Sequence, residues 1–184
     1  EGDENAWMDD SDVRISAYWS FLAGAAGYTY GCNDIWQMYS PGKEPQIFAR
    51  TSWNEAMHLP GSKQMLYLKK LLTSLPWYDL TYDASIIKSE NPMDSAYIMS
   101  ARGINNDLLL AYTPMGRSIE ADVSVLEAEK IAAWWYNPRD GKTTKIGEFI
   151  TDSKLPLFTP WSRGRGSDFV LLITDAKRRV AIFE

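Results

Sequence analysis

The segment Gly24–Trp36, with the sequence GAAGYTYGCNDIW, decides how the first half of the chain is interpreted. Its small residues lead into Tyr28–Gly31, which has the pattern of a short strand with its two tyrosines on one face. A polar loop that ends in Trp36 follows. A strand that leads into a polar and aromatic loop is typical of one βα unit of a (β/α)8 barrel, where the loop after each strand lies at the active site.

Apolar residues recur at helical spacing in two segments, one before and one after this expected strand. The first follows the acidic run Asp9–Asp12, which supplies an N-cap, and its apolar stripe is Val13, Ala17, Phe21, Leu22 and Ala25. Pro60 and Gly61 are expected to stop a short helical piece, after which Ser62 caps a second helix with the stripe Met65, Leu68, Leu72 and Leu75. This half alone is too short for a closed barrel, which needs about 200 residues or more.

The second half changes to short runs of β-branched and aromatic residues separated by turn signals. The candidate strands are Ala96–Ala101, Leu108–Tyr112, Ile119–Val123, Ile131–Tyr136, Thr143–Ile146 and Phe169–Thr174. Strands spaced by roughly 10 residues are typical of a β-sandwich. The expected fold class is therefore α/β plus all-β: the C-terminal βα part of a (β/α)8 TIM barrel in residues 1–82, followed by an antiparallel β-sandwich in residues 83–184. We expect the sandwich half to fold on its own.

The composition of the 184 residues argues against several classes of function. A net charge of −5 provides no electrostatic footprint for nucleic acid, and no apolar run approaches the ~20 residues of a membrane span. Cys32 and His58 are each the only residue of their kind, so we expect no Cys/His zinc site, no internal disulfide, no metal and no cofactor. The opening EGDENAW lacks an initiator methionine and a signal peptide, which indicates a chain that begins inside a longer protein.

Carboxylates and aromatic rings are the abundant functional groups, with 24 Asp plus Glu and 13% Phe, Trp and Tyr. This mixture suits sugar chemistry, because aromatic faces stack on pyranose rings and carboxylates drive glycoside hydrolysis. It equally suits a well-packed structural domain. Two local alternatives stay open as well. Trp36 either stacks on a sugar or packs in the protein, and Asp34 either orients a sugar hydroxyl or caps its loop.

Two tryptophan motifs in the second half also allow more than one interpretation. Trp134 and Trp135 are adjacent, so in a strand they point to opposite faces, one into the sandwich core and the other toward the helices; the alternative is that the pair forms a binding platform. Trp161, with Arg163 and Arg165 in the segment TPWSRGRGSD, either forms a surface sugar site or lies in a solvated loop.

The spaced motifs of both halves resemble the apiosidase-like glycoside hydrolases. In the first half the resemblance is carried by DVR (12–14), AYWS (17–20), LAGAAGYTYG (22–31), IWQMYSPG (35–42), LPGSKQM (59–65) and Trp77. In the second half it is carried by AYTPMGR (111–117) and WYNPRDG (135–141). The second half is similar to the β-sandwich that follows the barrel in that family, a domain that has been labelled as collagen-binding.

The resemblance implies a retaining-type glycosidase that acts on plant cell-wall glycans, such as pectin-type oligosaccharides, with two carboxylates. The family's acid/base lies upstream of this chain, and its nucleophile belongs at the end of the seventh strand. Glu1 is the candidate for that segment, the alternative being an ordinary loop carboxylate. The residues expected to bind substrate after the eighth strand are Tyr30, Asn33, Asp34 and Trp36. Many members carry histidine where this chain has Tyr28 and near Asn33, which affects which sugar fits.

Three classes of function remain open from the sequence. The first is the C-terminal part of a secreted, periplasmic or cell-surface glycosidase, which needs the N-terminal barrel segment of the same protein and is inactive as this chain alone. The second is a sandwich that binds polysaccharide or matrix protein without catalysis of its own. The third is a structural domain that stabilises the barrel. A dry apolar face against the helices favours the third, and exposed aromatic residues on the sandwich favour the second.

Overall fold

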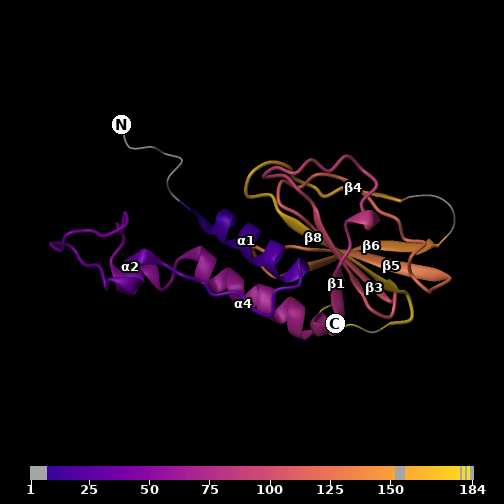
Figure 1. Ribbon diagram of the computed structural model, residues 1–184, viewed down its shortest axis with the longest axis horizontal. Coiled ribbons are helices and arrows are strands. Elements are labelled where there is room, and N and C mark those ends of the chain that lie inside the picture. The colour runs from indigo at the N-terminus through magenta and orange to yellow at the C-terminus, as the bar shows by residue number, and fades with distance from the viewer. Residues whose placement is uncertain (1–7, 152–155, 179, 181, 183–184) are drawn as a thin grey trace.

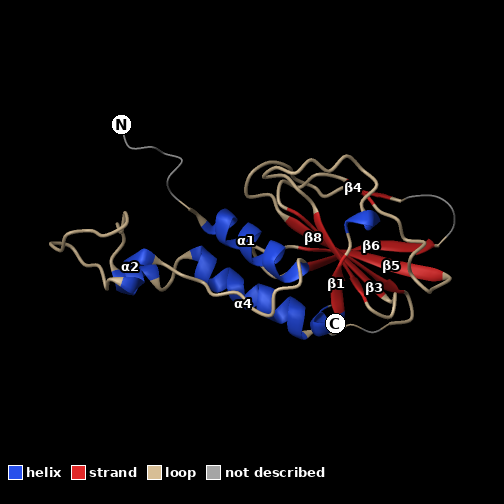
Figure 2. Ribbon diagram, viewed as in Figure 1, coloured by secondary structure: helices blue, strands red, loops and turns tan. Residues whose placement is uncertain are grey.

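A six-stranded antiparallel sheet with helices on one face forms the body of the protein (Figures 1 and 2). The computed structural model describes residues 8–151, 156–178, 180 and 182. The strand order of the large sheet is β1 (Leu80–Tyr82), β2 (Met99–Gly103), β3 (Leu108–Thr113), β8 (Phe169–Asp175), β5 (Lys130–Tyr136) and β6 (Thr143–Ile150). A second sheet pairs only β4 (Ile119–Glu120) with β7 (Leu157–Phe158).

The helical layer consists of α1 (Asp10–Leu22) and α4 (Pro60–Thr73), which run in the same direction across the sheet (Figure 1). A loop with two short helices, α2 (Asn33–Trp36) and α3 (Trp53–Ala56), joins them and projects away from the body. The 3-10 turns η2 (Trp77–Asp79) and η3 (Ala84–Ile86) flank β1. Among the helices that the structure describes, none has the length and apolar character that crossing a bilayer requires.

The start of α1 confirms the predicted acidic N-cap. The carboxylate of Asp9 accepts hydrogen bonds from the backbone N–H groups of Ser11 and Asp12, at 2.8 and 3.3 Å. In return, Asp12 Oδ2 accepts from the backbone N–H of Asp9 at 2.9 Å, which completes a capping box. These bonds satisfy N–H groups that a helix N-terminus otherwise leaves unpaired.

The expected stop at Pro60-Gly61 is wrong, because α4 begins at Pro60 and Leu59 occupies the N-cap position in place of Ser62. Proline is favoured at the first helical position, where its missing N–H has no partner to lose and its φ is already helical. Gly61 faces α1, where an added Cβ atom would lie in ordinary van der Waals contact, 3.4 Å from Val13 Cγ2.

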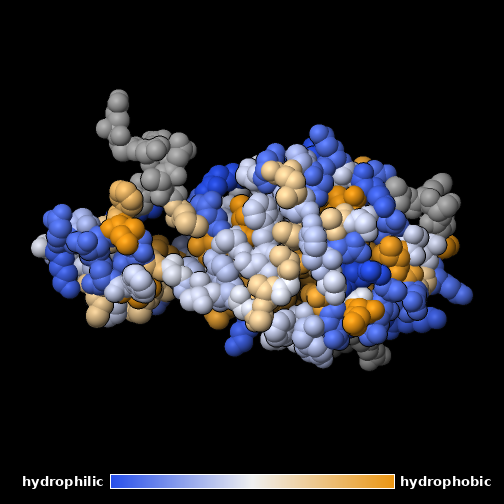
Figure 3. All heavy atoms as spheres, viewed as in Figure 1, coloured by the Kyte–Doolittle hydropathy of each residue, from blue (hydrophilic) through white to orange (hydrophobic). Residues whose placement is uncertain are grey.

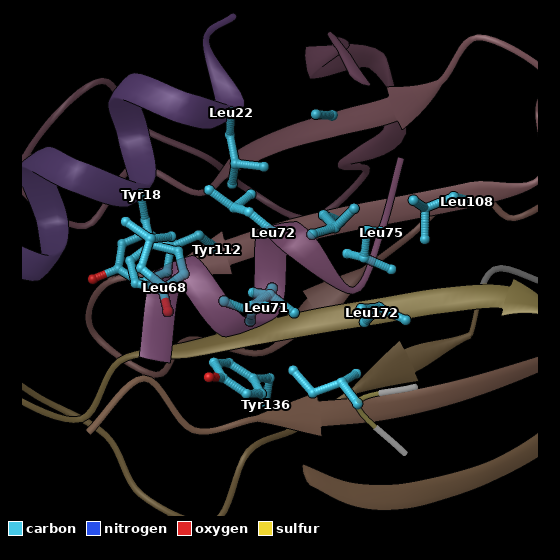
Figure 4. Packing of buried hydrophobic residues seen from close by; sticks show 14 of the residues in the cluster. Tyr18, Leu22, Leu68, Leu71, Leu72, Leu75, Leu108, Tyr112, Tyr136 and Leu172 are labelled. Atoms are coloured by element: carbon cyan, nitrogen blue, oxygen red, sulfur yellow. The ribbon is translucent and has the colours of Figure 1, made fainter. Parts of the chain in front are cut away.

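The helices bury one face of the large sheet (Figure 4). In that core, Tyr18 and Leu22 of α1 and Leu71 and Leu72 of α4 meet Tyr112 and neighbouring residues of the sheet. A second core lies on the opposite face, under η3, β4, β7 and the loops between them, and includes Ile98, Ile119, Trp135, Phe158 and Ile173. Both faces of the central strands are therefore dry. All six residues of β3 are buried.

Two expectations about the sheets are corrected by this arrangement. The antiparallel β-sandwich expected in residues 83–184 is instead one large sheet whose faces are covered by helices and by a two-stranded sheet with loops. The expected strand at Tyr28–Gly31 is absent, since no segment in the described part of the chain pairs with it. A strand requires a hydrogen-bonded neighbour, and this segment lies along the helices instead.

The paired tryptophans of β5 behave as the alternation predicted. Trp135 is 3% exposed and belongs to the core on the β4 side, where its ring meets Phe169 edge to face at 5.9 Å. Trp134 is partly buried and packs against the core under the helices. The two rings therefore anchor β5 to both layers.

Candidate functional site

Asp34, at the start of α2, holds the projecting loop together. Its Oδ1 atom accepts hydrogen bonds from the backbone N–H groups of Arg50 and Thr51, at 2.7 and 2.6 Å, and its Oδ2 atom accepts from Cys32 Sγ at 3.3 Å. Partial burial raises the pKa of Asp34, but the N–H groups of Thr51 and Arg50 outweigh that effect and leave the pKa below its usual value. Of the two roles left open by the sequence, these contacts give Asp34 the role of fixing the loop.

Asn33 lies at the surface beside Asp34 and holds a strained turn. Its Nδ2 donates to the backbone carbonyl of Ile47 at 3.0 Å. Ile47 and Phe48 both have positive φ angles, 45° and 60°, which side-chain-bearing residues rarely adopt and which are least favourable for a β-branched residue. Each such residue costs on the order of 1–3 kcal/mol, so the surrounding contacts must hold it. Asn33 is exposed, and within the described residues its Oδ1 atom accepts no hydrogen bond.

Tyr30, Asn33 and Trp36 line one hollow of ≈ 530 Å³, together with Thr29, Gly31, Cys32 and Ile35. Trp36 is 86% exposed, which is unusual for so large an apolar side chain. Asp34 does not line the hollow. The structure thus brings three of the four expected substrate-binding residues together and places the fourth behind them as their support. In Figure 3 the projecting lobe that carries this loop bears hydrophobic residues among hydrophilic ones.

Tyr28 and Tyr30 contact the helices that flank their segment. The hydroxyl of Tyr28 lies 2.8 Å from Ser16 Oγ of α1. The ring of Tyr30 lies against Gly61, where an added Cβ would be 3.5 Å from Tyr30 Cε2. Burial, with Cys32 and Asp34 nearby, raises the pKa of the Tyr30 phenol, so it stays protonated at neutral pH.

Both tyrosines also line a second, mostly apolar hollow of ≈ 270 Å³. It lies between the end of α1 and the length of α4, and its remaining walls are Phe21, Ala26, Met65, Leu68, Lys69, Leu72, Thr73 and Trp77. Tyr30 therefore separates the two hollows, with its ring against the helices and its neighbours Thr29 and Gly31 exposed.

A buried ion pair that the sequence reasoning missed ties α1 to the sheet. Arg14 Nε and Nη2 donate to the two carboxylate oxygens of Asp168, at 2.8 and 2.9 Å, and both residues are at most 1% exposed. Arg14 Nη1 donates to Gln64 Oε1 of α4 at 2.7 Å, and the hydroxyl of Tyr112 donates to Asp168 Oδ2 at 3.0 Å. The sequence did contain a sign of this pair: Arg14 lies on the same helical face as Ala17 and Tyr18, which predicts that it is buried. A buried charge needs a partner of opposite charge, so a buried carboxylate could have been expected nearby.

Two further expectations concern the chemistry of the site. Glu1, the candidate catalytic carboxylate, lies outside the described residues. Among the residues that the structure describes, no group of three or more His, Cys, Asp and Glu side chains is placed to hold a metal ion. Burial, together with the hydrogen bond to Asp34, raises the pKa of the Cys32 thiol, so this cysteine is a thiol rather than a thiolate at neutral pH.

Comparisons with known proteins cover both halves of the chain. Residues 1–79 match the model of the "Apiosidase-like, catalytic domain", and residues 82–174 match the model described as "Putative collagen-binding domain of a collagenase". A solved structure titled "Glycoside hydrolase" is 38% identical with a TM-score of 0.87, over 97% of this chain and 40% of that one. A glycoside hydrolase family 5 structure from Bacteroides vulgatus ATCC 8482 is 38% identical with a TM-score of 0.86, over 93% and 37%. The chain spans about 40% of these relatives' length, and no curated protein matches it.

Proposed function

The chain belongs to the apiosidase-like glycoside hydrolase family, and from this premise we propose that it is the C-terminal part of an enzyme acting on plant cell-wall polysaccharide. Residues 1–82 contribute the last helices of its (β/α)8 barrel and the segment Tyr28–Gly31, which we expect to become the last strand only where the N-terminal barrel segment supplies the neighbouring strands. Residues 83–184 form the domain that supports them. The substrate is a pectin-type oligosaccharide. The family relationship fits an extracellular or periplasmic location, so we place the enzyme among secreted, periplasmic or cell-surface proteins.

The observation that carries this proposal is the grouping of Tyr30, Asn33 and Trp36 around one hollow. The exposed indole of Trp36 offers a face on which a pyranose ring stacks, and Asn33 Oδ1 is open to a sugar hydroxyl. Asp34 acts as a positioning residue, because its carboxylate is occupied by the loop's own N–H groups. Asp34 thus holds the loop in place, and the side chains of Trp36 and Asn33 are available to the ligand.

At least one member of the carboxylate pair that hydrolysis requires, the acid/base, belongs to the N-terminal barrel segment of the same protein, which is the partner of this chain in the proposal; Glu1 remains the candidate for the other. A retaining enzyme holds its two carboxyl groups about 5–5.5 Å apart, and the described residues contribute supporting rather than reacting groups. The 184 residues alone are therefore expected to give no turnover.

In this proposal the large sheet supports the barrel. Its face under α1 and α4 is dry and apolar, as expected for a domain that stabilises the barrel, and the buried pair Arg14–Asp168 fixes the register of helix on sheet. Substrate binding and support thus reside in different parts of the chain, so that each can be altered separately.

The test is kcat/KM for Trp36→Ala and Asn33→Ala in the protein that includes the N-terminal barrel segment, with rhamnogalacturonan-type oligosaccharides. Losing the stacking face of Trp36 is expected to cost on the order of 1–3 kcal/mol of transition-state binding, and losing the Asn33 amide about 1 kcal/mol. Tm is expected to change little, since both side chains and the turn that Asn33 holds lie in the projecting loop, outside the two cores.

Tyr78→Ala is the matched control, because Tyr78 is an aromatic residue that is 74% exposed and lies away from the loop, beside β1. It is expected to leave kcat/KM unchanged. If Trp36→Ala and Asn33→Ala keep full activity, or lose activity only in step with Tm, the pocket assignment fails.

A further inference from the structure

Trp161 lies in the loop between β7 and β8, where its indole ring packs against the protein and is still largely exposed to solvent. It is 59% exposed, yet its ring meets the fully buried ring of Phe169 edge to face, with centroids 4.5 Å apart. Arg139 covers the same Phe169 ring, with its guanidinium carbon 4.6 Å from the centroid. Phe169 is therefore a rigid support that holds the indole at the surface. A held, exposed aromatic face is what stacking on a sugar ring requires.

Arg163, two residues further along, presents a positive charge without a carboxylate. Its Nη2 donates to Ser118 Oγ at 2.6 Å, and no Asp or Glu of the described residues lies within ion-pair distance of it. The neighbouring Arg165, by contrast, pairs with Asp9 and Asp12 at 2.9 and 2.8 Å. Two residues of chain span at most about 7 Å, so the Cα atoms of Arg163 and Trp161 lie within that distance of each other.

The loop that carries these residues is seated on the protein. The Gly164 N–H donates to the Met115 carbonyl at 2.9 Å, and Arg139 Nη1 donates to the Gly166 carbonyl at 2.7 Å. At Gly116, where φ is +60°, an added Cβ would clash with the Ser162 carbonyl and lie 2.6 Å from that of Ser167. These contacts hold the backbone of the loop on the protein, while Trp161 and Arg163 stay exposed to solvent.

The loop also lies at the same end of the helical layer as the hollow beside Trp36. The pairs of Arg165 with Asp9 and Asp12 place it at the N-terminus of α1. The close approach of Val13 and Tyr30 to Gly61 places the N-terminus of α4 and Tyr30 at that same end. Figure 1 shows the β7–β8 loop beside the N-terminal part of α1. The surface around Trp161 and Arg163 therefore lies on the same side of the molecule as a polysaccharide bound near Trp36.

We propose that Trp161 and Arg163 form a second carbohydrate-binding site that takes an acidic sugar unit. The pyranose ring stacks on the indole, and the uronate carboxylate pairs with the guanidinium, while the hydroxyls of Ser118 and Thr159, which are 3.0 Å apart, complete the polar edge. Only the choice of a polysaccharide ligand rests on the proposed function; the site itself stands on its own geometry.

The test is binding of oligogalacturonate to the 184-residue chain, followed by calorimetry, with a neutral galacto-oligosaccharide as the comparison. The wild-type chain is expected to prefer the acidic ligand and to bind it more weakly as salt rises. Trp161→Ala is expected to weaken binding of both ligands about tenfold. Arg163→Gln is expected to remove the preference for the acidic ligand while leaving binding of the neutral one unchanged.

Two controls match these changes. Tyr78→Ala removes another exposed aromatic ring, and Lys177→Gln removes another exposed positive charge, at the far end of β8. Both are expected to bind as the wild type does. Binding by Trp161→Ala or Arg163→Gln that equals the wild type overturns the proposal, as does binding of soluble collagen at this loop in place of the oligosaccharide. Activity measurements on Trp36→Ala and Asn33→Ala test the proposed function separately.

Discussion

Tyr18 and Tyr112 stack face to face, with ring centroids 4.8 Å apart and planes 7° from parallel, but only one of their hydroxyls is satisfied. Tyr112 donates to Asp168, whereas the Tyr18 hydroxyl is buried without a partner among the described residues. Burial raises the pKa of both phenols far above the usual value, so neither ionises in the folded protein. Removing the hydroxyl from Tyr18 and removing it from Tyr112 are therefore expected to change the stability of the protein in opposite directions.

Tyr18→Phe is expected to stabilise the chain by about 1 kcal/mol, because it removes a buried polar group that makes no hydrogen bond. Tyr112→Phe is expected to destabilise it by about 1–3 kcal/mol, since Asp168 loses one of its donors. Urea unfolding of the two variants measures both effects against the wild type. Equal destabilisation by both would mean that the Tyr18 hydroxyl has a partner in solution.

Arg14→Ala is expected to destabilise the chain by about 3–5 kcal/mol, because it leaves the carboxylate of Asp168 buried and unpaired. Arg165→Ala removes an arginine that is half exposed, and is expected to cost about 0–1 kcal/mol. A double-mutant cycle with Asp168→Ala measures the coupling of the buried pair. Additive effects of Arg14→Ala and Asp168→Ala would refute direct coupling.

Asp34→Ala is expected to release the projecting loop without unfolding the body. The amide protons of Arg50 and Thr51 donate to Asp34, so their hydrogen-exchange protection is expected to fall in the variant. The amides of β3 serve as the internal reference and are expected to exchange as in the wild type. Unchanged protection at Arg50 and Thr51 would remove Asp34 from its positioning role.

Acidification is expected to lower Tm below about pH 4. The pKa of Asp12 is lowered chiefly by Arg165, and burial raises the pKa of Asp10 but Gln64 and Arg14 lower it more. A carboxyl whose pKa is depressed on folding stabilises the protein above its unfolded pKa of ~3.9 and loses that contribution as pH falls through the folded value. Tm measured from pH 7 to pH 2 tests this, with Arg165→Ala expected to flatten part of the decline.

Residues 83–184 alone are expected to be molten, contrary to the independent folding that the sequence suggested. Without α1 and α4, the sheet face that includes Leu110, Tyr112 and Leu172 is exposed, and β1 is missing from the edge. Strong binding of a hydrophobic dye and a non-cooperative thermal transition are the expected signs, with the 184-residue chain as the control. A cooperative transition of the shorter piece would contradict this prediction.

The sequence predicted the strands better than the layers. β3, β5 and β8 were located within one residue at each end, because their β-branched and aromatic runs are bounded by turn residues. The sequences LLLAYT and FVLLIT do not alternate between apolar and polar residues. Because a strand that is buried on both faces has a continuous apolar sequence, these two strands indicated that both faces of the sheet are covered. β1 and β7 were missed, because strands of two or three residues are set by their partners rather than by their own pattern.

In the candidate site, residue types could be predicted but not their orientations. The loop Cys32–Trp36 was identified by its polar and aromatic content, yet the carboxylate of Asp34 turns toward backbone N–H groups some 16 residues further along. The same is true of Arg14, whose partner Asp168 lies 154 positions away. Contacts across such distances depend on how the layers assemble, which local spacing does not encode.

The outer position of β6 has a consequence for how this protein behaves at high concentration. β6 is an eight-residue strand at the border of the sheet, where no strand of the described residues pairs with its outer edge, and Ile150 on it is 73% exposed. Such an edge invites pairing with a second molecule, and charge is the usual safeguard. Lys145 and Glu148 stand on this strand and pair with each other, while the irregular register between Ala133 and Trp134 bends its partner β5. Charge and curvature at this border thus oppose aggregation, and neutral substitutions there favour it.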